Sequence, residues 1–349
     1  IRGLSPKYNA ITVDGTRLAS TDPDDRSTDL SMISQYMLDG IEVTKAGTPN
    51  LDADVLGGTV NFKLKKAESG LHANVITQGI YNGLKETSDD YKYVYSVSNR
   101  FWKDRIGILG QTDIEKRNRG SHELGAGYTN PQATLDSITT LRLMSLNLYD
   151  INRINNRENT LIVMDVKIPN GGDFSYSNLS SAINKDITIH SANYSVGGNT
   201  GRGYSSAISD NSINISTETI KYQQTLFSKL HFDAFKSFTQ SKNTYKDYTF
   251  YFTEPDAYTE QTSGIGITKV LQIAKNDTGA IGFENYTYNQ NKSKESESTF
   301  GFNLEYDFRV SKLLSGKITI GNKFRSKKRE FDRNSERANV AAPAGLTIP

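Results

Sequence analysis

Cysteine is absent and histidine is scarce, and both facts exclude whole classes of site. Without a single cysteine among its 349 residues, the chain forms no disulfide, no thiolate zinc site and no iron–sulfur cluster, and it has no cysteine nucleophile. Its histidines lie far apart along the sequence, with none at metal-ligand spacing: His72, His122, His190 and His231. We therefore expect no resident metal and no cofactor.

The chain also lacks an excess of charge and a long apolar run. Its 41 Lys and Arg residues against 39 Asp and Glu residues leave a net charge of +2, so the charge balance does not favour nucleic acid as a partner. Hydrophobic residues make up 36%, and no apolar stretch approaches the roughly 20 residues of a membrane helix. This excludes helical membrane proteins alone, because strands that cross an outer membrane carry a polar residue at every second position.

The first 68 residues read as a small mixed α+β unit. An Asp-Gly pair between two short apolar alternations predicts a β-hairpin, because both residues tolerate positive φ. Apolar residues at three- to four-residue spacing predict a short amphipathic helix that ends near Gly40. The expected elements are a hairpin over 11–18, a helix over 30–38, and strands over 41–45 and 59–64.

From about residue 70 the sequence changes to a two-residue alternation. In residues 297–308, 222–232 and 317–325, one face carries polar side chains and the other carries aliphatic and aromatic ones. We expect strands of about ten residues, which matches the length that crosses a bilayer at a tilt. Soluble β-sandwiches show the same alternation, so the pattern alone leaves both classes open.

The connections between these strands are predicted to alternate in length. Short turns are expected at 103–104, 169–172 and 309–315, and long polar loops at 117–145, 196–213 and 253–265. Short turns at one end and long loops at the other are typical of outer-membrane barrels.

Four motifs in the first part occur in an order that is specific in combination. Residues 1–3 read Ile-Arg-Gly; the predicted hairpin follows; a helix then leads into Ile-Glu-Val at 41–43; Gly-Gly at 57–58 opens an alternating strand. This order resembles the plug domain of TonB-dependent outer-membrane receptors, and the remainder resembles the start of that family's 22-stranded barrel. The implied fold class is mainly β: a plug domain over 1–68 and the first part of a transmembrane β-barrel over 69–349. We expect the chain to be a fragment, truncated at both ends.

The resemblance implies a receptor that takes up a scarce solute, either a carbohydrate or an iron–siderophore, across the bacterial outer membrane. The implied partners are TonB of the inner-membrane energy-transducing complex, the extracellular solute, and outer-membrane lipid or lipopolysaccharide, with no nucleic acid. Such transport makes and breaks no bond, and we find no catalytic set, so the chain is predicted not to be an enzyme. The alternative is a soluble or surface-exposed β-rich adhesin or glycan-binding module.

Candidate site residues follow from the same resemblance. Arg2 matches the plug arginine that pairs with barrel carboxylates in this family, so it is a candidate plug–barrel latch; a solvated arginine at a turn is the alternative. The plug apex supplies the candidate ligand contacts, which are Lys7, Tyr8, Asp24, Asp25 and Arg26. A merely solvated acidic loop is the alternative there. A basic run at 327–329 offers charge to lipopolysaccharide phosphates, or is a solvated strand end.

Overall fold

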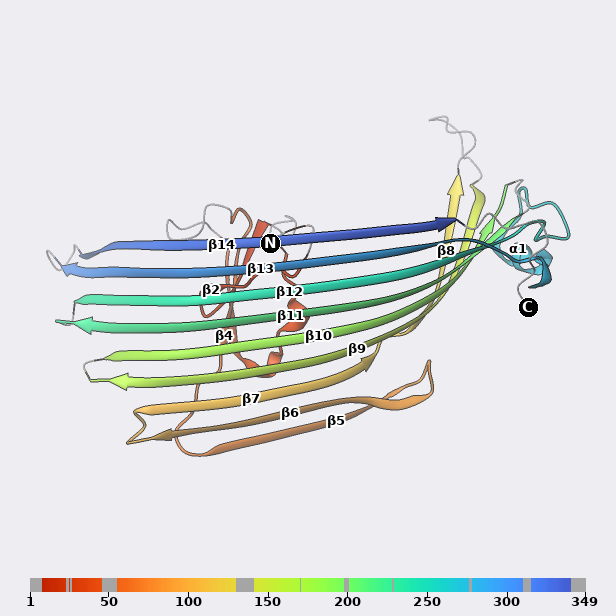
Figure 1. Cartoon of the computed structure of the whole chain (residues 1–349). Coiled ribbons are helices and arrows are strands. Elements are labelled where there is room, and N and C mark those ends of the chain that lie inside the picture. The colour runs from red at the N-terminus through yellow and green to blue at the C-terminus, as the bar shows by residue number, and fades with distance from the viewer. Residues whose placement is uncertain are drawn as a thin grey trace.

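The chain folds into two β-sheets of different size (Figure 1). The computed structural model describes residues 8–22, 25, 27–45, 55–129, 141–169, 171–197, 201–227, 229–275, 278–309 and 315–339. The helices in these residues are all too short or too polar to cross a membrane.

The first sheet belongs to the N-terminal unit, by which we mean the described residues up to Ala67. Its strands follow the order β2-β1-β4-β3, with β1 parallel to β4 and the other pairs antiparallel. Their bounds are β1 Asn9–Val13, β2 Thr16–Arg17, β3 Leu38–Thr44 and β4 Gly58–Leu64. Between β1 and β2, Asp14 and Gly15 have φ values of 48° and 82°. The predicted hairpin is therefore confirmed, as are the two predicted strands.

The predicted helix over 30–38 is wrong. Two separate 3₁₀ turns stand there, η2 (Leu30–Met32) and η3 (Gln35–Met37). The side chains of Asp29 and Ser34 each accept a hydrogen bond from a backbone N–H two residues later, so each starts a new turn. The apolar spacing therefore predicted which residues are buried, since Met32 and Met37 are both fully buried, but not the backbone path.

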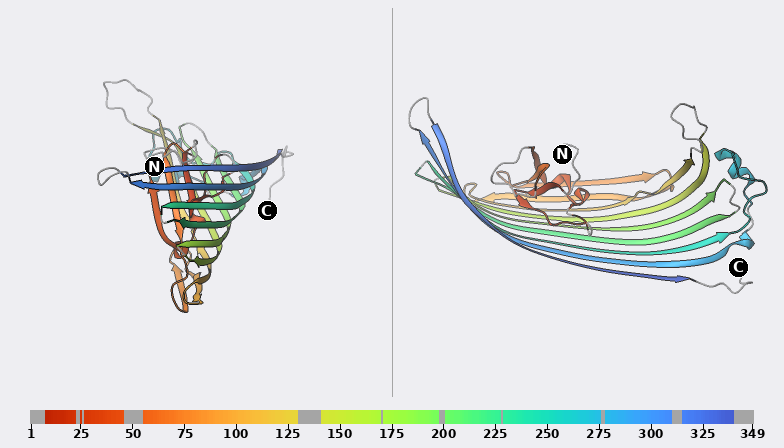
Figure 2. Two further views of the ribbon diagram at one scale, coloured as in Figure 1. Left: turned by 90° about the vertical axis from the view of Figure 1, so that its left-hand side faces the viewer. Right: turned by 90° about the horizontal axis from the view of Figure 1, so that it is seen from above.

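The large sheet is antiparallel, with strand order β14-β13-β12-β11-β10-β9-β7-β6-β5 and β8 paired to the start of β9. Its strands are β5 His72–Asn82, β6 Thr87–Phe101, β7 Ile106–Asn118, β8 Ser121–Thr129, β9 Arg142–Ile168, β10 Gly172–Ser195, β11 Arg202–Leu226, β12 Leu230–Glu254, β13 Gly282–Arg309 and β14 Ser315–Asn339. Figure 2 shows this sheet curving into a trough that holds the N-terminal unit on its concave side. Within the described residues β5 and β14 are its two edges, so the mainly β fold is confirmed, whereas closure into 22 strands stays a prediction.

Strands β9 to β14 are far longer than the ten residues expected, from 24 residues in β10 to 28 in β13. The apolar alternation covers only the halves nearest the short turns. Beyond it the strands continue with polar cross-strand pairs, such as the hydroxyls of Ser191 and Ser205 at 2.7 Å, and with stacked aromatic pairs, such as Tyr248 and Tyr288. For this reason the long loop predicted over 196–213 is wrong, because β11 already begins at Arg202.

The other connections follow the prediction more closely. The turns at 103–104 and 169–172 are short, as expected, and lie at the left-hand end of Figure 1. Most of the third predicted turn, 309–315, lies outside the described residues. The single strand predicted over 222–232 is wrong, because β11 ends at Leu226 and β12 begins at Leu230, with Phe227 at a φ of 51° and 91% exposed between them.

The long loop predicted over 117–145 is wrong in part, since it contains β8 and the start of β9, and its residues 130–140 lie outside the described residues. The loop predicted over 253–265 belongs to a longer connection with α1 (Ile267–Ile273) and η4 (Thr278–Ala280).

The two faces of the large sheet differ in chemistry. In β9, Leu161 and Val163 are buried while the intervening Ile162 and Met164 are 38% and 45% exposed. We call the exposed apolar side chains of the convex face the apolar band. Its members include Val97, Ile108, Ile162, Met164, Ile220, Phe238, Phe300, Leu304, Ile320 and Phe324. The band occupies the strand halves nearest the short turns and confirms the predicted alternation.

The concave face shares one hydrophobic core with the N-terminal unit. The unit contributes Val13, Leu18, Met32, Met37, Phe62, Leu64 and Ala67. The large sheet contributes Leu109 from β7, Leu161 and Val163 from β9, Leu179 and Ile183 from β10, and Ile213 and Ile215 from β11. Burial of this apolar surface, which contributes about 25 cal/mol per Å², holds the unit in the trough.

On β12 and β13 the contact with the N-terminal unit is polar instead. The buried concave-face residues there are Ser237, Thr239, Ser241, Asn243, Glu295, Glu297 and Thr299. Thr239 and Asn243 donate hydrogen bonds to the carbonyls of Arg17 and Thr21. The unit therefore shares its hydrophobic core with β7–β11, where Ser181 and Lys185 add polar contacts to Met32 and Asp29, whereas its contact with β12–β14 is mainly hydrogen-bonded.

Candidate functional site

The candidate site is the interface between the N-terminal unit and the concave face, together with the mouth beyond it. At the apex, the loop after β2 turns its backbone toward β12, β13 and β14. Glu295 accepts a hydrogen bond from the backbone N–H of Ser20 at 2.9 Å, and Ser241 donates to the Ser20 carbonyl. Arg329 donates to the carbonyls of Asp22 and Asp25 at 2.6 and 3.0 Å. Backbone groups that no strand partner satisfies are thus satisfied by the large sheet.

Only two of the predicted site residues lie in the described part of the chain. Tyr8 is 37% exposed just before β1, and its carbonyl accepts a hydrogen bond from the Gly57 N–H. Asp25 is half-buried in the apex loop, where its carboxylate accepts from the Ser27 N–H at 2.6 Å. Their ligand-binding roles stay predictions. The remaining candidates, Arg2, Lys7, Asp24 and Arg26, lie outside the described residues.

An ion pair joins the apex loop to β10. Lys185 Nζ lies 2.9 Å from Asp29 Oδ2, with both side chains mostly buried. Burial alone would raise the pKa of Asp29, but the hydrogen bonds from Ser31 and Lys185 and the charge of Lys185 outweigh it, so the pKa of this carboxyl is lowered. The carboxylate is therefore held ionised in the folded protein.

A pH dependence of stability follows from this pair. A carboxyl whose pKa is lowered on folding stabilises the protein at pH values above its unfolded pKa, about 3.9, and loses that contribution as the pH falls through the folded value. We expect Asp29→Asn to lower the urea midpoint at pH 7, and the gap to wild type to narrow as the pH falls below about 4 toward the lowered pKa of Asp29. Urea titrations of the detergent-solubilised protein between pH 3 and 7 measure this. A gap that stays constant across that range would contradict it.

At the other end of the unit, Arg100 on β6 joins three elements. Its guanidinium lies 2.7 Å from Asp165 Oδ2 on β9 and donates at 2.7 Å to the carbonyl of Ala67, the last residue of the N-terminal unit. It also donates to the Asp104 carbonyl in the adjacent turn. The side chains of Arg100 and Asp165 are 7% and 1% exposed, so this is a buried charge pair at the exit from the N-terminal unit.

Beyond the apex, the connection that contains α1 folds back onto the strand ends. Its Tyr258 donates a hydrogen bond to the Ser195 carbonyl at 3.0 Å, and burial raises the pKa of Tyr258 to about 12, so this hydroxyl stays a donor at neutral pH. The connection packs into a second buried cluster, which includes Leu146, Tyr194, Val270 and Ile273. The Arg202–Glu254 pair, with side chains 5% and 1% exposed, closes this cluster.

The predicted basic run over 327–329 divides between the two faces. Lys327 Nζ lies 2.7 Å from Glu295 on the concave side, and Arg329 contacts the apex loop there. Lys328 lies on the opposite face because side chains alternate along a strand, and it pairs with Glu330. Of the two alternatives for this run, contact with lipopolysaccharide phosphates is therefore open only to Lys328, the one residue of the three on the convex face.

Sequence reasoning missed the charge pairs that join the two parts. Asp29 and Lys185 are 156 residues apart, and Arg100 and Asp165 are 65 apart. One signal was available in the sequence. Asp165 follows Leu161 and Val163 at two-residue spacing and so lies on the buried face of the strand, where a carboxylate needs a partner. The identity of that partner depends on strand register.

Comparison with known proteins adds the family of the N-terminal segment. Residues 1–59 match the family model described as the TonB-dependent Receptor Plug Domain, which confirms the resemblance predicted from the motifs of this segment. None of the curated proteins matches the sequence of the chain.

Among solved structures, the chain is similar to the siderophore receptor PiuA from Acinetobacter baumannii, at 11% identity and a TM-score of 0.29, over 95% of this chain and 55% of that one. It is also similar to the siderophore receptor PirA from the same organism, at 10% identity and a TM-score of 0.30, over 96% of this chain and 71% of that one. The chain thus spans about half the length of the first of these receptors.

Proposed function

Because the chain carries a TonB-dependent receptor plug domain, we propose that it belongs to an energised importer of the bacterial outer membrane. One observation carries the proposal: the N-terminal unit, from here on the plug, packs into the concave face of a ten-stranded sheet whose convex face is apolar. Residues 1–68 then form the plug and 69–349 part of a 22-stranded barrel. TonB pulls the plug to admit the solute, and no reaction is catalysed.

The chemistry of the convex face supports a location in the outer membrane. The apolar band lies against lipid in this proposal, and cations follow it on the side away from the short turns. Lys328 lies four residues beyond Phe324, about 13 Å along the strand. Lys242 and Lys294 are directly opposite each other one row farther on, and opposed like charges destabilise a sheet unless an anion lies near them. Glu330 on β14 is directly opposite Lys294 and supplies one negative charge. We propose that phosphate groups of lipopolysaccharide add to it.

The concave face of β14 favours an anionic solute. All the basic side chains of β14 except Lys328 stand at odd-numbered positions, which face the concave side: Lys317, Lys323, Arg325, Lys327, Arg329, Arg333 and Arg337. Arg329 contacts the apex of the plug, and Arg333 and Arg337 follow it toward the mouth. Clefts lined by one sign of charge concentrate ligands of the other sign. An iron–siderophore complex with net negative charge fits this better than a neutral carbohydrate.

Uptake by cells tests the function and the solute class together. We expect cells that produce the full-length protein to take up a ⁵⁵Fe-labelled anionic catecholate complex only when TonB is present. Reversing two charges, by Arg333→Glu with Arg337→Glu, should lower the uptake rate about tenfold or more, because the attraction of the mouth is lost.

Lys292→Glu is the matched control, since this exposed lysine lies on the convex face of the neighbouring strand. It should leave uptake unchanged. Uptake of a labelled neutral oligosaccharide in place of the iron complex would assign the carbohydrate class. Binding to whole cells without TonB-dependent uptake would favour the adhesin or glycan-binding alternative and overturn the transport proposal.

A further inference from the structure

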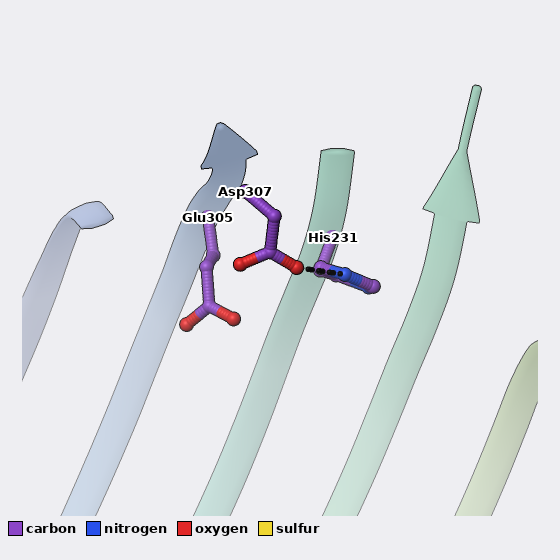
Figure 3. A group of neighbouring side chains, drawn as sticks. All are labelled: His231, Glu305 and Asp307. Atoms are coloured by element: carbon purple, nitrogen blue, oxygen red, sulfur yellow. Dashed lines mark hydrogen bonds and ion pairs between the residues drawn. The ribbon is translucent and has the colours of Figure 1, made fainter. Parts of the chain in front are cut away.

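We propose that His231, Glu305 and Asp307 form a binding site for a divalent transition metal of the Zn²⁺ type on the concave face. One ligand atom from each residue lies within 4.8 Å of the other two (Figure 3). All three side chains are partly exposed, so an ion can reach them. The site lies near the short-turn ends of β12 and β13, on the wall rather than on the plug, and it does not depend on the proposed transport function.

Strand register builds the cluster. His231 on β12 is directly opposite Glu305 on β13, and Asp307 lies two residues along β13 on the same face. Directly opposed Cβ atoms are about 5 Å apart and diagonal neighbours about 7 Å, which is close enough for the three side chains to bring one ligand atom each within 4.8 Å of the others. Because both strands sit inside a continuous antiparallel ladder, the backbone positions of the ligands are fixed before an ion arrives.

A contact from outside the cluster orients the imidazole. The hydroxyl of Thr225 on β11 lies 3.0 Å from His231 Nδ1, and the other ring nitrogen, Nε2, lies 3.1 Å from Asp307 Oδ2. Metal-binding histidines are held in this way, by a hydrogen bond at the nitrogen that does not face the ion. Nε2 is therefore directed at the Asp307 carboxylate, with Glu305 next to Asp307, as Figure 3 shows.

A lysine beside the cluster shows that the electrostatic potential there attracts cations. Lys317 Nζ lies 2.6 Å from Glu305 Oε1, and its side chain is 56% exposed. One ammonium faces two carboxylates here, and an exposed lysine can rotate into solvent when a divalent ion replaces it. Lys317 is thus a competitor for the site rather than a part of it.

The donor set selects the metal class. One imidazole nitrogen with two carboxylate oxygens suits Zn²⁺ and its neighbours, and three protein ligands leave the fourth position open to water. Mg²⁺ and Ca²⁺ prefer oxygen ligands alone and in larger number. The histidine spacing along the sequence predicted no metal site because His231 and Asp307 are 76 residues apart and only the strand pairing joins them.

The chain contains a matched control at the other side of the sheet. His122 Nε2 lies 3.2 Å from Asp150 Oδ1, and Lys85 Nζ lies 3.2 Å from the same oxygen. This group also combines a histidine, an aspartate and a lysine, and His190 is directly opposite Asp150, but the group does not appear among the described clusters with three possible ligands. Replacing His122 therefore tests whether any surface histidine binds the ion, or only the three-ligand cluster.

Zinc titration of the detergent-solubilised protein, followed by calorimetry with Zn²⁺ alone, tests the proposal. We expect one site in the wild type that a large excess of Mg²⁺ does not displace. His231→Ala and Asp307→Asn should each weaken binding at least about tenfold. His122→Ala should leave it unchanged, and Lys317→Met should tighten it, because the competing ammonium is gone.

These residues are exposed, so the variants are expected to fold, and the urea midpoint of each checks this. The proposal is overturned if the wild type binds no Zn²⁺ at a defined stoichiometry. It is also overturned if His122→Ala weakens binding as much as His231→Ala does. Uptake assays are not needed for either result, so failure here leaves the transport proposal intact.

Discussion

Arg100→Ala is expected to lower the free energy of unfolding by about 3–5 kcal/mol. The substitution leaves Asp165, 1% exposed, as a buried carboxylate without its partner. It also removes the donor to the Ala67 carbonyl at the plug exit. There is little space for compensation, since a Cβ on Gly107 would come within 2.6 Å of Asp165 and 3.0 Å of Arg100.

Urea unfolding of the detergent-solubilised protein measures this change. Lys116→Ala is the control: it breaks an ion pair with Asp89 of similar length, 2.6 Å, whose side chains are 27% and 57% exposed. Pairs of that kind contribute about 1 kcal/mol or less. Replacing both buried partners, by Arg100→Met with Asp165→Leu, should recover much of the loss, because no unpaired charge remains. Equal effects of Arg100→Ala and Lys116→Ala would contradict the assignment.

Arg202→Ala is expected to release the connection that follows β12 while the sheet stays folded. Glu254 Oε2 accepts from Arg202 at 2.9 and 2.7 Å and from the Tyr204 hydroxyl at 2.8 Å. Arg202 also donates to the Lys275 carbonyl, which ties the end of the connection to β11. Removing one member of a buried pair costs about 3–5 kcal/mol. Here we expect this loss to lower the free energy of local opening of residues 257–275.

Hydrogen exchange read by mass spectrometry gives the outcome. Peptides from 257–275 should exchange about a hundredfold faster or more, since each 1.4 kcal/mol corresponds to a factor of ten. Peptides from the strands should be unchanged. Lys275→Ala is the control in the same segment, because its pair with Asp256 is exposed and its carbonyl remains. Faster exchange throughout the sheet would instead assign Arg202 to global stability.

The parts of the fold that were predicted correctly depend on local signals. The Asp14-Gly15 turn needs positive φ, and only the two residues themselves decide that. Strands were recognised where apolar side chains on the convex face alternate with mostly polar side chains on the concave face, as in 297–308. Residues 202–213 were taken for a loop because polar residues fill most positions on both faces, and their strand depends on partners in β10 and β12.

The candidate site was less accessible from the sequence. Motif order placed the apex of the plug, and the structure shows how Asp25 is held there, by Ser27 and by a guanidinium 304 residues away. The acidic loop was read as a surface for ligand, yet much of its hydrogen bonding goes to the large sheet. Contacts of this kind follow from register, since shifting one strand by two residues changes every partner across the interface.

The plug's two flanks differ in how they part from the large sheet. On the β12–β14 flank, each hydrogen bond to Ser20, Thr21 or Asp22 can be exchanged for one with water, at little net change in free energy. On the β7–β11 flank, separation exposes Met32, Met37 and their neighbours, at a cost that grows with every Å². If the plug is pulled as proposed, we therefore expect its β12–β14 side to separate first, while the side that shares the hydrophobic core with β7–β11 stays in contact. In the proposed importer, the first passage would then lie along β14, beside its concave-face arginines.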